Sequence, residues 1–191
     1  MAKAKEVIEI IPPKNIFVGN KHAPVTLMEF GEYENEDCAK ANEVVKKLLD
    51  EFGDKLRFNF RHFPLTNIHQ RSMKASEASV AAAQDGKFWE MHNLLFQHRR
   101  QLGTISLKLY SKEAGVNNKS FLNQMVDGTF GWQVRADLME GLNKGIKKIP
   151  AFFINGEQYS GKISFEEMKK AITSTLRKTK SKTKTAVKQR A

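Results

Sequence analysis

Two strand-like patterns flank one helical pattern in the first third of the chain. Residues 25–30 form a short, mostly apolar run that is typical of a buried strand. Leu56, Phe58 and Phe60 alternate with polar residues, which indicates a strand with one buried face. Between these runs, apolar or small residues recur every three or four positions, at Cys38, Ala41, Val44, Val45, Leu48, Leu49 and Phe52. The pattern predicts a β-α-β unit with parallel strands.

The rest of the chain predicts a helical block followed by two strands and a last helix. Residues 72–144 carry helical patterns almost throughout, interrupted by glycines. Residues 150–154 form an apolar run, and Asn155-Gly156 is a dipeptide that two-residue hairpin turns prefer. A final amphipathic helix is expected from about residue 164 to residue 176. The order β-α-β, helical block, β-β-α predicts an α/β fold whose single sheet is split by a helical insertion.

The length and composition suit one domain that carries an insertion. The chain has 191 residues, of which 40% are hydrophobic and 28% are charged, as in ordinary water-soluble proteins. No apolar run approaches the roughly 20 residues that a membrane helix needs, so no membrane span is expected. Residues 1–11 do not resemble a signal peptide, which predicts a cytoplasmic protein unless a signal has been removed.

The excess positive charge gathers near the C-terminus. The formal net charge is +11, and seven basic residues but no acid lie in residues 177–191. This segment has too few apolar residues to order itself, so a disordered basic tail is expected there. It can simply increase solubility, or it can attract nucleic acid or another anionic partner nonspecifically.

Three segments, residues 23–34, 87–96 and 145–156, together resemble the DsbA-like branch of the thioredoxin superfamily. Residues 23–34 resemble the family's strand and its approach to the active site, and residues 87–96 resemble a signature of its helical insertion. Residues 145–156 resemble the loop in which such proteins place a cis-proline beside the active site. The resemblance implies a thioredoxin fold with an inserted all-helical subdomain. The implied boundaries are a thioredoxin-like domain at residues 14–66 and 147–176, a helical insertion at residues 67–146 and the basic tail at residues 177–191.

The matching active-site motif departs from the family pattern. Members that exchange disulfides carry Cys-x-x-Cys after the first strand, and the positions here are Asn35, Glu36, Asp37 and Cys38. Cys38, the only cysteine of the chain, matches the second cysteine, and Asn35 replaces the first. In dithiol exchange the first cysteine attacks as a thiolate and the second resolves the mixed disulfide. Because asparagine cannot attack, dithiol exchange is expected to be lost or reduced to monothiol chemistry at Cys38.

The predicted environment of Cys38 disfavours a thiolate. Cys38 lies on the core-facing stripe of its helix, directly after Glu36 and Asp37. Burial and neighbouring carboxylates raise the pKa of a thiol, whereas the start of a helix lowers it. We expect a mostly protonated thiol, which is either a buried structural cysteine or a working monothiol. Asn35 is expected to cap the helix through its side-chain oxygen.

Two more positions acquire roles through the resemblance. Glu29 matches a place where DsbA-like proteins bury a carboxylate beneath the active site, where it either assists proton movement or is a partly satisfied acid. If the Ile149–Pro150 bond is cis, as in similar proteins, its turn exposes backbone groups that can pair with an extended peptide. The five histidines fit no known metal-ligand spacing, and neither does the acidic cluster formed by Glu29, Glu32, Glu34, Glu36 and Asp37. Neither a metal nor a cofactor is therefore expected.

Two functions remain open from the sequence. The first is a protein related to thiol-disulfide oxidoreductases, acting through Cys38 on a polypeptide or on a low-molecular-weight thiol. The second is a noncatalytic, chaperone-like module that binds peptides or proteins at the Pro150 loop. The sequence therefore leaves undecided whether the chain is an enzyme.

Overall fold

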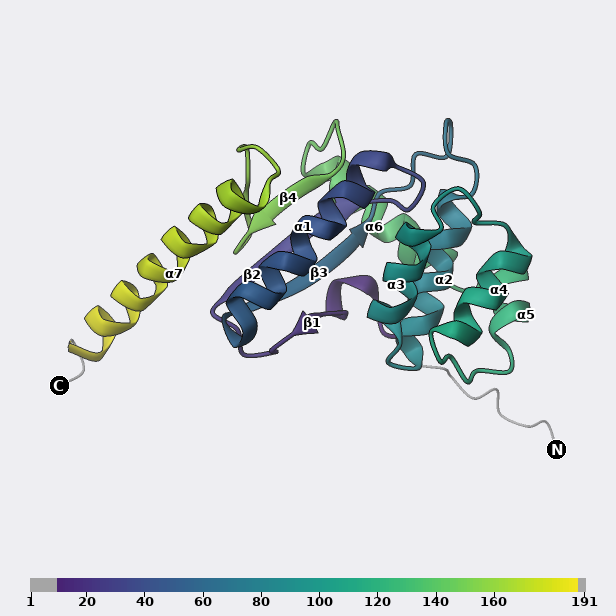
Figure 1. Ribbon diagram of the computed structural model, residues 1–191, viewed down its shortest axis with the longest axis horizontal. Helices are drawn as coiled ribbons and strands as arrows, with labels where there is room; N and C mark the ends of the chain where they lie inside the picture. Colours follow the sequence, from purple (N-terminus) through teal and green to yellow (C-terminus); the bar gives the residue numbers. More distant parts are fainter. Residues whose placement is uncertain (1–9, 189–191) are drawn as a thin grey trace.

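A five-stranded mixed sheet forms the centre of the computed structural model, which describes residues 10–188 (Figure 1). The strands are β1 (Val18–Gly19), β2 (Val25–Gly31), β3 (Leu56–His62), β4 (Ala151–Ile154) and β5 (Glu157–Gln158). They lie in the order β1-β3-β2-β4-β5. β2 runs parallel to β3 and antiparallel to β4, so the predicted β-α-β unit and the later hairpin share one sheet.

Seven helices surround this sheet in the described part of the chain. They are α1 (Glu36–Phe52), α2 (Ser72–Gln84), α3 (Phe88–Gln97), α4 (Thr104–Glu113), α5 (Phe121–Val126), α6 (Gly131–Asn143) and α7 (Phe165–Lys188). α1 and α7 pack against each other, and α2 to α5 gather beside one end of the sheet (Figure 1). The arrangement confirms the predicted thioredoxin fold with an inserted helical subdomain. None of the described helices is long and apolar enough to cross a bilayer.

The core forms where the sequence places its apolar stripes. Val25, Leu27 and Phe30 of β2 are fully buried, and so are Leu56, Phe58 and Phe60 of β3. α1 closes one face of the sheet with Cys38, Ala41, Val45 and Leu48. The remaining apolar positions of the predicted α1 stripe are only partly buried, because they lie at the margin of the contact.

Both faces of β3 are buried, whereas its alternating pattern predicts one buried face. Asn59 donates hydrogen bonds to the carbonyl oxygens of Pro13 and Ile16, at 2.8 and 2.7 Å. Arg61 is held by Asp137 of α6. The polar face is therefore covered by the N-terminal segment and by α6, and its side chains are satisfied by partners from those elements.

α7 extends beyond the end that the sequence predicts. The structure continues the helix from residue 176 through Lys188, where a disordered tail was expected; residues 189–191 lie outside the described part. No glycine or proline interrupts this stretch, and Lys, Arg, Leu and Ala favour helices. Met168 and Ile172 anchor the first turns in the core. The second half of α7 runs away from the sheet (Figure 1).

Candidate functional site

The start of α1 carries the four-residue motif that replaces Cys-x-x-Cys. Asn35 is the N-cap, and its side-chain oxygen accepts a hydrogen bond of 2.9 Å from the backbone N–H of Cys38. This confirms the capping role predicted for Asn35. Glu36 and Asp37 occupy the first turn, and the ammonium group of Lys40 lies 2.9 Å from Glu36 and 3.8 Å from Asp37. The conformation of the motif is thus stabilised by a hydrogen bond and by ion pairs in which no sulfur atom takes part.

Cys38 is a free thiol with none of its surface exposed. Burial raises its pKa well above the usual value, and the negative charges of Glu29, Glu32 and Asp37 raise it further. A backbone hydrogen bond from Glu32 acts in the opposite direction but is a smaller effect than burial or the charge of Glu29. Cys38 is therefore protonated at neutral pH, as the sequence predicts.

Glu29 lies in the core beneath the start of α1, as the resemblance implies. Neither of its carboxyl oxygens has a hydrogen-bond partner among the described residues, and burial raises its pKa well above the usual value. A β-carbon added to Gly31 would meet Glu29 Oε1 at 2.8 Å and Cys38 Sγ at 3.2 Å. The carboxyl group and the thiol therefore face the same small space, which only a glycine at position 31 leaves free.

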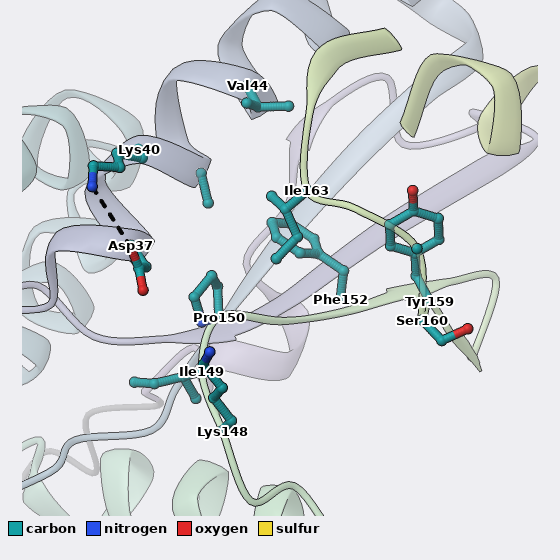
Figure 2. Close-up of a pocket in the computed structure, with 12 residues that line it drawn as sticks. Asp37, Lys40, Val44, Lys148, Ile149, Pro150, Phe152, Tyr159, Ser160 and Ile163 are labelled. Atoms are coloured by element: carbon teal, nitrogen blue, oxygen red, sulfur yellow. Dashed lines mark ion pairs between the residues drawn. The ribbon is translucent and has the colours of Figure 1, made fainter. Parts of the chain in front are cut away.

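A cavity of about 560 Å³, here named the Pro150 groove, lies beside this motif (Figure 2). Its apolar lining consists of Ala41, Val44, Ile149, Phe152 and Ile163, together with Pro150 itself. Its polar lining includes Asp37, Lys40, Lys148, Tyr159 and Ser160. Figure 2 shows Asp37 and Lys40 on one side and Tyr159 and Ser160 on the other, with Pro150 between them.

The groove joins three segments that are distant in sequence: α1, the loop before β4, and the loop between β5 and α7. The Ile149–Pro150 peptide bond within it is cis. Of the residues that the sequence singles out, Asp37, Ile149 and Pro150 line the groove, whereas Cys38 and Glu29 lie in the core behind it. Sequence reasoning did not include Tyr159, Ser160 and Ile163. Their only sequence signal is that they follow the predicted hairpin, which folds back toward α1.

The acidic residues before α1 are engaged by other parts of the chain. Glu32 pairs with His69, and Glu34 accepts a hydrogen bond of 2.8 Å from the backbone N–H of Arg71. Within residues 10–188, no group of His, Cys, Asp and Glu side chains is placed to hold a metal ion. These carboxylates instead fix the loop between β2 and α1 against the segment that follows β3.

A family model described as Thioredoxin matches residues 12–174, which is most of the chain. The chain belongs to the thioredoxin family. Solved structures of similar fold include oxidised BdbD from Bacillus subtilis, with a TM-score of 0.78 and 22% sequence identity over 87% of this chain and 93% of that one. The thiol-disulfide exchange protein alpha-DsbA2 from Wolbachia pipientis matches with a TM-score of 0.71 and 17% identity, over 83% of this chain and 85% of that one. The expected DsbA-like fold is confirmed.

Curated relatives of this thioredoxin-family chain are longer proteins. The Na(+)/H(+) antiporter NhaA 1 of Salinispora arenicola is 31% identical over 168 residues, which cover 88% of this chain and 26% of the antiporter. The NhaA 3 antiporter of Salinispora tropica is 30% identical with the same coverage. The chain thus spans about a quarter of the length of these relatives. What the comparisons establish is a thioredoxin-family fold, whose first active-site cysteine is replaced here by Asn35.

Proposed function

We propose that this thioredoxin-family chain binds extended polypeptide segments in the Pro150 groove and that its dithiol exchange is lost. The main support for this proposal is that the groove is open to solvent, whereas the only thiol beside it is buried. Asp37, Lys148 and Ile163 are exposed at the groove, whereas Cys38 has no exposed surface. The site therefore offers a binding surface without a nucleophile.

The groove has the properties that polypeptide binding requires. Its volume falls within the range of about 300–1,000 Å³ that is typical of ligand sites. Apolar side chains from α1, β4 and the two loops can bury an apolar residue of the bound segment, which supplies the main favourable free energy. The irregular backbone around Pro150 can position the segment through main-chain hydrogen bonds. None of these contacts involves Cys38.

The binding function predicts that one substitution in α1 weakens binding and that another leaves it nearly unchanged. We expect Val44→Asp to weaken binding of a permanently unfolded polypeptide, reduced and carboxymethylated α-lactalbumin, by about tenfold or more, because it places a charge on the apolar lining. We expect Cys38→Ser to change the affinity less than about twofold. Fluorescence anisotropy of the labelled polypeptide measures both affinities, and circular dichroism verifies that each variant is folded.

A matched control for this experiment is Val126→Asp, at an exposed valine of α5 outside the groove. It introduces the same charge and should leave the affinity unchanged. Loss of binding in Cys38→Ser, or equal losses in Val44→Asp and Val126→Asp, would contradict binding at the Pro150 groove.

Monothiol chemistry at Cys38 is the second candidate. It is favoured by the position of the sulfur at the start of α1 and by the backbone hydrogen bond from Glu32, since both stabilise a thiolate. Burial and three nearby carboxylates destabilise the thiolate more strongly, so the pKa of Cys38 is raised. The geometry therefore supports binding better than catalysis.

The reaction of Cys38 with oxidised glutathione tests this second candidate through its pH dependence. Because the thiol pKa is raised, we expect little mixed disulfide at pH 7 and a rate that increases toward pH 10, as the thiolate fraction grows. Intact-mass measurements over time give the rate, and Cys38→Ser provides the baseline. Rapid glutathionylation at neutral pH would restore monothiol chemistry as the leading function.

A further inference from the structure

The negative charge at the start of α1 is balanced by partners near it. Lys40 lies within 4 Å of both Glu36 and Asp37, and Arg99 lies 3.3 Å from Glu36. Two basic groups therefore balance the two acidic groups of this helical turn, of which Asp37 and Lys40 line the Pro150 groove. Asp37, the only acidic residue that lines the groove, is already paired (Figure 2).

The loop before β4 carries positive charge without a partner. Lys148 lines the groove next to Ile149 and Pro150, it is exposed, and its ammonium group makes no ion pair or hydrogen bond with any described residue. Lys147 and Lys162, which adjoin lining residues in the two loops of the groove, are also exposed, and no described residue forms an ion pair or hydrogen bond with their ammonium groups. Glu167 of α7, whose charge acts on Tyr159 of the groove, is paired with Lys170 at 2.7 Å.

We infer that the Pro150 groove selects extended polypeptides in which an aspartate or glutamate stands two residues from an apolar residue, on the same side of the segment, with the carboxylate at Lys148. The inference rests on the proposed function and names its substrate class. The apolar residue fills the space lined by Val44, Phe152 and Ile163, and the acidic residue meets the unpaired lysine on the loop. Complementary charge supplies selectivity, while apolar burial supplies most of the affinity.

The composition of the groove favours a polypeptide over a small inorganic anion. Phosphate or sulfate could pair only with a single lysine, which acts as a point charge. Such an anion has no apolar surface to bury against the apolar lining of the groove. A polypeptide can present an apolar and an acidic side chain on the same side of one extended segment. It also presents backbone groups to the loop around Pro150.

Changing the charge of the ligand and reversing the charge at the groove together test this selectivity. Three fluorescein-labelled, end-blocked nonapeptides have the same valine- and leucine-containing sequence and differ only in a central Glu, Gln or Lys. We expect the unaltered protein to bind the Glu peptide about fivefold more tightly than the Gln peptide, and the Lys peptide most weakly. The Lys148→Glu variant should reverse the order, with a loss of about tenfold for the Glu peptide.

The control is Lys108→Glu, at an exposed lysine of α4 whose side chain has no described partner. It makes the same change in net charge away from the groove, and the order of the three affinities should stay that of the unaltered protein. Equal binding of all three peptides, or the same reversal in Lys108→Glu, overturns the selectivity and leaves peptide binding standing. Failure of the unaltered protein to bind any of the three peptides overturns the proposed function together with the inference.

Discussion

Asn35→Cys is expected to give this chain a disulfide-exchange activity at least about 100-fold above that of the natural sequence. Position 35 is partly exposed at the start of α1, three residues before Cys38. A cysteine at the start of a helix has a lowered pKa and attacks as a thiolate, and Cys38 can then resolve the mixed disulfide. Turbidity during insulin reduction measures turnover, and intact mass reports formation of the internal disulfide.

Two controls isolate the chemistry in this experiment. Asn35→Ser keeps a capping oxygen but adds no thiol, so it should remain inactive. Asn35→Cys combined with Cys38→Ser should form a mixed disulfide with glutathione but fail to resolve it. The loss of the asparagine cap itself costs only about 1 kcal/mol, so the variant should fold. If Asn35→Cys keeps two free thiols in excess oxidised glutathione, the residue at position 35 alone does not decide whether this chain can exchange disulfides.

Asp137→Ala is expected to lower the free energy of unfolding by about 3–5 kcal/mol. Asp137 Oδ1 accepts a hydrogen bond of 2.7 Å from Arg61 Nε and forms an ion pair with Nη2 at 2.6 Å, and Oδ2 accepts a bond of 2.9 Å from the backbone N–H of His62. Both partners of the ion pair are almost fully buried. The substitution leaves the guanidinium group buried with only a partly exposed acid beside it. Equilibrium unfolding in urea, followed by circular dichroism, measures the change.

Glu140→Ala is the matched control for this prediction, since Glu140 contacts the same guanidinium group at 2.5 Å. Its side chain is 38% exposed, so water screens the pair and the expected cost is about 1 kcal/mol or less. Similar losses in the two variants would show that Asp137 contributes no more than a surface partner.

The sheet and α1 could be predicted from sequence because their periodic patterns are local. The alternation at Leu56, Phe58 and Phe60 and the stripe that begins at Cys38 each specify an element and its buried face. The partners of the polar positions could not be predicted in the same way. Asp137 lies 76 residues after Arg61, and no local pattern links the two. Their pairing depends on how the helical insertion folds back onto β3.

The candidate site divides in the same manner. The motif at residues 35–38 and the Pro150 loop could be found from the resemblance, and Asn35 as a cap follows from its position before a helix. The third side of the groove, formed by Tyr159, Ser160 and Ile163, could not, because these residues lie in an irregular loop. The C-terminal end of α7 could not be predicted from the sequence either. Helix propensity continues past the last buried residues, and the burial pattern alone does not define where the helix stops.

Because Asn35 caps α1 through its side chain, the turn at residues 35–38 contains no disulfide that could form or break. In a dithiol protein the covalent structure at this turn differs between the oxidised and the reduced form, because a disulfide forms or breaks there. Here a side-chain amide closes the turn, and the single cysteine is enclosed in the core. This chain, with one cysteine, therefore forms no internal disulfide in either reducing or oxidising surroundings. We expect the shape of the Pro150 groove to be the same at low and at high redox potential.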